Sequence, residues 1–196
     1  MIIEVKQTGD PVLRRKAHKI NRTDQALRTL ANDMLETMRE SGGVGLAAPQ
    51  IGESIRLIVV EYPENDQEED SPLKTYKLVN PEITWKSEET TVGVEGCLSF
   101  KGLVGEVERA ESIKLRAQSI HGRPLKITAS GWLARIFQHE IDHLDGVCYV
   151  DRATRIWEMT DEEEEDGEEI AMNGSAEAPA DASAHVQEQT TSPADH

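Results

Sequence analysis

The stretch that decides both fold and chemistry spans residues 131–144 and reads GWLARIFQHEIDHL. Its apolar side chains recur at the spacing of one helical face. That face would also carry Glu140, and its members are Leu133, Ile136, Phe137, Glu140, Ile141 and Leu144. Gly146 follows shortly after, as a residue that often ends helices. The pattern predicts a helix with a buried face.

The same stretch contains His139-Glu140-Ile141-Asp142-His143. On a helix, residues four apart lie about 5–6 Å from each other on one face. Two imidazoles placed in this way can bind one metal ion, and the intervening Glu140 can reach a water held by that ion. Taken alone, the pentapeptide also fits a helix that carries two unrelated histidines.

A third metal ligand must come from another segment. Tyr149 occupies the position where an extended zinc-protease motif would place a histidine. The downstream acids before the acidic run are Asp145, Asp151 and Glu158. Cys97, in EGCLS at residues 95–99, is the better candidate because a thiolate binds Fe²⁺ or Zn²⁺ strongly. A lone cysteine is more often a small buried hydrophobe, so both interpretations stay open at this point.

Residues 43–50 read GVGLAAPQ, and their small side chains allow a backbone to pass close to a ligand. Gln50 offers an uncharged amide donor. The segment lacks the lysine of a phosphate-binding loop and does not follow a strand, so phosphate binding is not indicated. The alternative is a helix end followed by a tight turn.

The remaining patterns predict an α+β fold, with antiparallel strands packed around the central helix that carries HEIDH. Residues 24–41 have an amphipathic helical pattern, with Thr23 as N-cap and Gly42 and Gly43 as the stop. A short third helix is expected at 151–159. An acidic loop is expected at 64–70 and a turn at 121–124. Strands are expected at 57–60, 73–79, 83–85, 113–117 and 125–127. In the strand at 113–117, Ile113, Leu115 and Ala117 point to one face, and Lys114 and Arg116 point to the other.

The chain has 196 residues and a formal net charge of −16, but its acidity is unevenly placed. Residues 161–196 hold 12 acids and no Lys or Arg, which leaves residues 1–160 with a net charge of only −4. We expect a catalytic domain at 1–160 and a disordered acidic tail at 161–196. The near-neutral body predicts no direct contact with nucleic acid.

The cysteine count and the N-terminal residues bear on the compartment. Two cysteines cannot form a disulfide scaffold. The first 20 residues lack the apolar run of a signal peptide, and no stretch approaches the roughly 20 apolar residues that span a bilayer. We expect a cytoplasmic protein without a membrane partner.

Together, the segments GVGLAAPQ, EGCLS and QHEIDH resemble the three motifs of the peptide deformylase family, in order and spacing. The resemblance extends to GDPVLRRKA at 9–17 and HLDGVCYVDR at 143–152, and it covers roughly residues 2–158. It implies a metal-dependent hydrolase that acts in translation. This hydrolase would remove the formyl group from the initiator methionine of nascent polypeptides and release formate.

The resemblance also implies residue roles. Cys97, His139 and His143 would hold the metal, natively Fe²⁺, with Zn²⁺, Ni²⁺ or Co²⁺ as substitutes. Glu140 would be the general base and acid, while Gln50 and the backbone N–H of Leu98 would donate to the oxyanion. Substrate contacts would come from Val44, Gly45, Glu95, Trp132 and Ile136, although Trp132 equally fits core packing.

One further pairing follows from helix geometry. Asp142 lies beside His143 on the helix but is turned about 100° from it, so it faces away from the metal. A buried carboxylate needs a cation, and Arg109 on the strand region after EGCLS is the candidate. We expect Arg109 and Asp142 to form an ion pair behind the site.

Two other classes of function compete with deformylation. One is a catalytically silent metal-binding or ribosome-tethered protein, which would lack Glu140, Gln50 or a ligand. The other is a metallopeptidase that cleaves ordinary peptide bonds, against which the small residues at 43–50 argue. The expected partners are N-formyl-methionyl nascent peptides and a transiently nearby ribosome, with the protein a monomer.

Overall fold

The computed structural model describes residues 1–65, 68 and 70–159, and the predicted disordered tail lies outside the described residues. The α-helices in these residues are α1 (Gln25–Glu40) and α2 (Gly131–Leu144), and short 3₁₀ helices span Pro11–Arg14, Ala48–Ile51 and Tyr149–Asp151. The strands are β1 (Gly45–Ala47), β2 (Leu57–Pro63), β3 (Leu73–Lys86), β4 (Thr90–Gly96), β5 (Leu103–Ala110), β6 (Ser112–Ser119), β7 (Pro124–Ser130) and β8 (Arg155–Glu158). Within the described part of the chain, no helix combines the length and apolarity needed to cross a bilayer.

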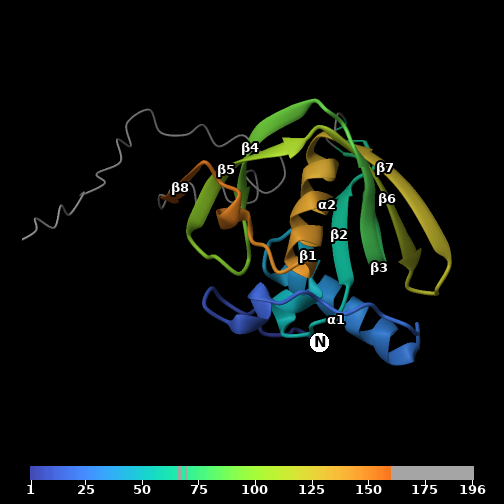
Figure 1. Ribbon diagram of the computed structural model, residues 1–196. Coiled ribbons are helices and arrows are strands. Elements are labelled where there is room, and N and C mark those ends of the chain that lie inside the picture. The colour runs from blue at the N-terminus through green and yellow to red at the C-terminus, as the bar shows by residue number, and fades with distance from the viewer. Residues whose placement is uncertain (66–67, 69, 160–196) are drawn as a thin grey trace, which may run out of the picture.

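Two antiparallel sheets flank the helix α2 (Figure 1). The larger sheet has the strand order β1-β2-β3-β6-β7, and the smaller has the order β4-β5-β8. The apolar face of α2 packs with the inward residues of the larger sheet in one cluster that includes Phe137, Ile141 and Leu144. This arrangement confirms the predicted α+β fold with HEIDH on a central helix.

The helix α2 begins and ends close to the predicted bounds. It spans the whole quoted stretch, and Gly146 follows the C-cap residue Asp145 with a φ of +77°. Arg135, Gln138, His139 and Glu140 are buried together with the apolar positions. So many buried polar side chains on one helix are unusual for a helix that serves only packing, and they indicate a functional site on α2.

The helix α1 covers part of the outer face of the larger sheet (Figure 1). Its apolar stripe packs against residues of β2, including Leu57 and Val59. The predicted N-cap Thr23 is wrong, because the Asp24 carboxylate accepts the N–H of Leu27 at 3.0 Å. Aspartate at this position can satisfy a free N–H of the first turn, so the helix starts one residue later.

Each of the five predicted strands lies within a strand of the structure, whereas β1, β4, β5 and β8 were not among the predicted ranges. Strand β6 alternates as expected, with Ile113, Leu115 and Ala117 buried and the basic residues between them exposed. The two predicted strands at 73–79 and 83–85 form the single strand β3, with a register shift between Val79 and Glu82. Their separation in the sequence pattern reflects this irregularity around Pro81.

The predicted helix at 151–159 is wrong. A 3₁₀ turn spans Tyr149–Asp151, and β8 then pairs antiparallel with β5, with Gly105 opposite Ile156. Burial along β8 alternates with a period of two, and the free edge of β5 supplies partners for its backbone. Pairing with that edge therefore overrides the local helical signal.

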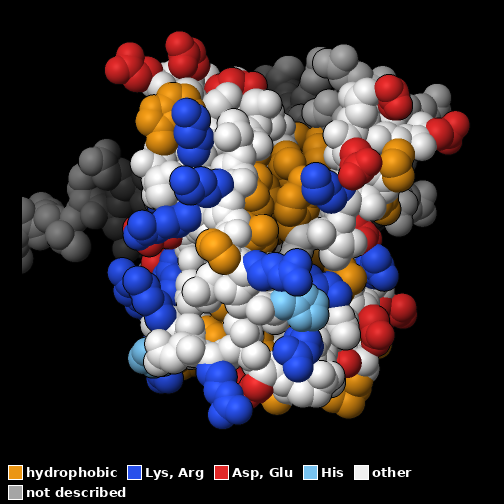
Figure 2. Space-filling view, turned by 90° about the vertical axis from the view of Figure 1, so that its right-hand side faces the viewer, with side chains coloured by type: hydrophobic (Ala, Val, Ile, Leu, Met, Phe, Trp, Pro, Cys, Tyr) orange, Lys and Arg blue, Asp and Glu red, His pale blue; other side chains and the backbone are white. Residues whose placement is uncertain are grey.

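The outer surface of β6 and β7 carries basic side chains. Figure 2 shows Lys and Arg gathered on the face that lies on the right-hand side of Figure 1. Lys114, Arg116 and Lys126 are exposed on these two strands, and Arg116 pairs with Glu82. This surface lies on the far side of the larger sheet from α2.

Candidate active site

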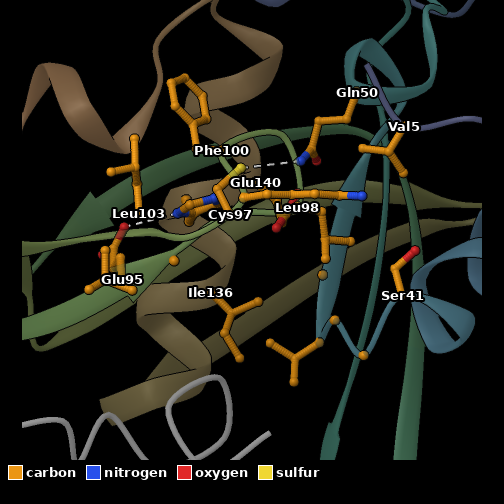
Figure 3. Close-up of a pocket in the computed structure, with 18 of the residues that line it drawn as sticks. Val5, Ser41, Gln50, Glu95, Cys97, Leu98, Phe100, Leu103, Ile136 and Glu140 are labelled. Carbon is orange, nitrogen blue, oxygen red and sulfur yellow. Dashed lines mark hydrogen bonds and ion pairs between the residues drawn. The ribbon is translucent and has the colours of Figure 1, made fainter. Parts of the chain in front are cut away.

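One cavity of about 980 Å³ lies where α2, β1 and the end of β4 meet (Figure 3). Ten of the residues that the sequence predicts for the site line this cavity. They are Val44, Gly45, Gln50, Glu95, Cys97, Leu98, Trp132, Ile136, His139 and Glu140. Three segments that are far apart in the sequence therefore meet at one cavity.

Cys97 and His139 line this cavity, and His143 lies directly beside both of them. The Nε2 atoms of the two histidines lie 3.2 Å apart, and Cys97 Sγ lies 3.3 Å from His143 Nε2. All three ligand atoms lie within 4.8 Å of one another. Cys97 follows directly on β4, whereas the histidines stand one turn apart on α2.

This donor set fits a metal ion. One thiolate and two imidazoles suit Fe²⁺ or Zn²⁺, and three protein ligands leave a coordination position for solvent or substrate. Glu95 Oε2 lies 2.9 Å from His139 Nδ1. Because an ionised carboxylate only accepts, Nδ1 carries the proton and the Nε2 lone pair is left for a metal.

Glu95 is itself held by two buried arginines. Arg109 donates to both carboxylate oxygens, at 2.9 and 2.8 Å, and Arg135 donates to Oε1 at 2.8 Å. Burial alone would raise the pKa of Glu95, but the hydrogen bonds from Arg109 and His139 hold that pKa well below its usual range. The carboxylate is therefore an anion that orients the His139 ring.

Arg109 continues this chain of ion pairs to the surface. It pairs with Asp142, as expected from the sequence, and Asp142 also accepts from Arg152 at 2.6 and 2.7 Å. The Arg109 side chain is 3% exposed and that of Arg152 is 43% exposed. The inner pair is thus sheltered, whereas the outer pair is shared with solvent.

The Glu140 carboxylate is buried and reaches the cavity. Its Oε2 atom has no hydrogen-bond partner among the described residues. Burial raises the pKa of Glu140 to about 7. A carboxylate with a free oxygen at the cavity wall can accept a proton from a bound water and pass it on.

Gln50 presents its amide N–H₂ to the same place. The backbone N–H of Ala47 donates to Gln50 Oε1 at 2.8 Å, which fixes the amide orientation. The Nε2 atom then points to Cys97 Sγ at 3.4 Å and to Ser99 Oγ at 3.3 Å (Figure 3). An uncharged donor is thus held beside Cys97, one of the three residues of the metal-binding group (Cys97, His139 and His143).

The backbone N–H of Leu98 is oriented by a turn. The Cys97 carbonyl accepts the N–H of Phe100 at 2.9 Å. The Cys97 carbonyl and the Leu98 N–H belong to the same trans peptide and point in opposite directions. The Leu98 N–H therefore points away from the turn. The Leu98 side chain lines the cavity beside Gln50 (Figure 3).

Comparison with known proteins decides the family. The family model for polypeptide deformylase matches residues 2–159. The chain belongs to the peptide deformylase family. The peptide deformylase of Dictyoglomus thermophilum is 48% identical over 162 residues, which is 83% of this chain and 99% of the relative.

Solved deformylase structures share the fold. The crystal structure of the Thermotoga maritima peptide deformylase has a TM-score of 0.72 and 38% identity, covering 79% of this chain and 99% of its own. A class I type b peptide deformylase from Acinetobacter baumannii bound to Met-Ala-Ser has a TM-score of 0.71 and 38% identity, covering 78% and 98%.

Membership in the deformylase family establishes the reaction. The chain is a hydrolase that removes the N-formyl group from the methionine of nascent polypeptides during protein biosynthesis. The family is metal-dependent, and the Cys97, His139 and His143 group could hold the ion.

Sequence reasoning missed two parts of this deformylase site. Glu95 lines the cavity, but the contacts of its carboxylate with His139, Arg109 and Arg135 were not predicted. Arg135 was not singled out, although it precedes His139 by four residues and so shares its helix face. That spacing is the signal in the sequence that could have found it.

Proposed function

We propose that the cavity holds the formyl-methionyl end of a nascent peptide, with the formyl group beside Cys97, His139 and His143. One observation carries this proposal. The three ligand atoms, the unpartnered oxygen of Glu140 and the amide N–H₂ of Gln50 meet at one cavity. In this proposal, the substrate methionine contacts Val44, Gly45, Trp132 and Ile136, which line the same cavity.

The natural ion in this proposal is Fe²⁺, held by Cys97, His139 and His143, with Zn²⁺, Ni²⁺ or Co²⁺ as substitutes. When bound, the ion supplies Lewis-acid chemistry and makes water nucleophilic near neutral pH. The mixed sulfur and nitrogen donors support this choice, because thiolate and imidazole are ligands that such ions favour. Glu95 supports it because its carboxylate accepts from His139 Nδ1, which leaves Nε2 as the ring nitrogen that faces His143.

Glu140 moves the proton. Its carboxylate takes a proton from water as the water oxygen bonds to the formyl carbon. The proton then passes to the α-nitrogen of methionine as the bond from that nitrogen to the formyl carbon breaks, which releases a free amine and formic acid, and the acid ionises to formate at neutral pH. The buried position of Glu140 beside Gly45 supports this role, because the carboxylate stands at the cavity wall.

Gln50 and Leu98 stabilise the oxyanion. As water adds, the formyl oxygen gains negative charge and needs donors that are already in place. Gln50 Nε2 meets this need because Ala47 holds the other end of its amide. The Leu98 N–H is the second donor.

The assignment of Glu95 changes from substrate contact to support of His139. Its carboxylate accepts from two arginines and faces Nδ1 of the imidazole. Arg109 and Asp142 in turn support Glu95 from behind. These residues act through His139 and do not touch the substrate.

The setting follows from the substrate. Formyl-methionyl chains emerge from ribosomes, so we place the enzyme in the cytoplasm, transiently near the ribosome, as a monomer. The proposal includes no direct contact with nucleic acid and no membrane partner. The net charge of −4 for residues 1–160 supports the part that concerns nucleic acid.

The test is product analysis after incubation of anaerobically purified protein with formyl-Met-Ala-Ser. Deformylation releases formate and leaves Met-Ala-Ser intact, whereas an ordinary metallopeptidase would cleave the Met–Ala bond. Acetyl-Met-Ala-Ser is the matched control, since its extra methyl group must fit where the formyl hydrogen lies. Cleavage of Met–Ala, or equal rates for the two substrates, would contradict the proposal.

A further inference from the structure

Arg135 is a buried arginine that the reaction described above does not use. It lies on α2, four residues before His139, and its side chain is 5% exposed. A fully buried guanidinium is costly unless its donors are satisfied. The N–H groups of Arg135 must therefore have acceptors among the buried groups around it.

The guanidinium of Arg135 joins three acceptors from two strands. Nη1 donates to Glu95 Oε1 and to the Val107 carbonyl, each at 2.8 Å. Nη2 donates to the Thr91 carbonyl at 2.8 Å. Thr91 and Glu95 belong to β4, and Val107 belongs to β5.

These contacts connect the two halves of the metal-binding group. The strand β4 leads directly into Cys97, whereas α2 carries His139 and His143. Arg135 therefore ties the helix that carries the imidazoles to the strand that delivers the thiol. It also occupies Glu95 Oε1, while Oε2 faces His139.

The neighbours of Arg135 leave room for this arrangement. A Cβ at Gly93 would lie 2.9 Å from Arg135 Cζ and 3.0 Å from its Nε and Nη2 atoms. The Trp132 ring lies on the helix side, with its centroid 5.4 Å from Cζ. The guanidinium is thus enclosed between β4 and α2, and any larger residue at 93 would displace it.

We propose that Arg135 is a positioning residue for the metal-binding group. Through Glu95 it fixes the His139 ring, and through Thr91 and Val107 it holds β4 and β5 at the depth that keeps Cys97 beside the imidazoles. This inference rests on the proposed metal-binding role of Cys97, His139 and His143. It adds a residue that touches none of the ligands directly.

The test measures binding of Co²⁺ to the metal-free full-length protein, by titration against a competing chelator. The absorption bands of bound Co²⁺ report its ligands independently of turnover. Arg135→Met should weaken Co²⁺ binding about 10- to 100-fold and alter the thiolate band, as residues behind metal ligands typically do. Arg135→Lys should give an intermediate loss, because one ammonium nitrogen cannot serve acceptors on both strands.

Two further variants separate positioning from general stability. Arg116→Met removes an exposed arginine of β6 that pairs with Glu82 on β3, and it should leave Co²⁺ binding unchanged. Gly93→Ala keeps Arg135 but displaces its guanidinium, so it should shift Co²⁺ affinity and spectrum in the same direction as Arg135→Met. Val92→Ala, at the exposed neighbouring position of β4, is its control.

The outcomes are distinguishable. Failure of the wild-type protein to bind Co²⁺ with a thiolate band would refute the proposed function itself. If the wild type binds and Arg135→Met lowers only the melting temperature, with affinity and spectrum unchanged, the positioning role is refuted. Should Arg135→Met not fold, wild-type binding by Arg135→Lys and Gly93→Ala would refute it equally.

Discussion

Gly45 lies directly against the carboxylate of Glu140. A Cβ at position 45 would come within 2.9 Å of Glu140 Cδ and closer still to Oε1. The first residue of β1 therefore lacks a side chain where the proposed base meets the cavity wall. This close contact between the segment at 43–50 and the helix α2 therefore requires glycine at position 45.

The first prediction follows from that contact. Gly45→Ala should lower kcat by on the order of 10²-fold, because the added methyl group displaces the carboxylate that moves the proton. Steady-state rates with formyl-Met-Ala-Ser measure the effect. Gly43→Ala is the comparison, since its Cβ would meet the end of the flexible Leu98 side chain at 2.9 Å. A loss at Gly43 as large as that at Gly45 would contradict the account.

Gln50 provides a second prediction. Gln50→Ala should lower kcat by about 10²-fold with little change in KM, as removal of an oxyanion donor does. Gln50→Glu keeps an acceptor for the Ala47 N–H but places an anion beside the developing charge, so its loss should be at least as large. A rise in KM at constant kcat would make Gln50 a simple binding residue.

The two arginines around Asp142 should differ sharply in their effect on stability. Arg109→Met leaves the buried carboxylate of Glu95 without its bidentate partner, and it should lower the free energy of unfolding by about 3–5 kcal/mol. Arg152→Met removes the more exposed partner of Asp142 and should cost only about 0–1 kcal/mol. Urea unfolding of both variants tests this, and equal losses would show that burial does not govern the chain of ion pairs.

The sequence predicted the helix at 131–144 well because its apolar period and its length agree with burial between two sheets. Cys97 was different: its residue type alone left two interpretations, and only three co-linear motifs joined it to the histidines. The contacts of Glu95 with Arg109 and Arg135 depend on how β4, β5 and α2 cross, which no local pattern encodes. The strand β8 was missed for a related reason, since its backbone pairs with an edge supplied by β5.

The acidic tail gives a fourth prediction. Deletion of residues 161–196 should leave deformylation and the melting temperature nearly unchanged, because the family match ends at residue 159 and every proposed site residue precedes it. The segment holds 12 acids and no Lys or Arg, and it has few apolar groups to bury. A loss of several degrees, or of most activity, would show that the tail packs on the catalytic domain.

The most direct test of the central claim combines metal content and turnover in Glu140→Gln. The amide is nearly isosteric with the carboxylate but cannot carry the proton, and it is not one of the three proposed ligands. We predict that the variant retains one metal ion per chain while formate release from formyl-Met-Ala-Ser falls about 10²- to 10⁴-fold. Formate release within a few-fold of the wild-type rate, with the metal still bound, would contradict the account.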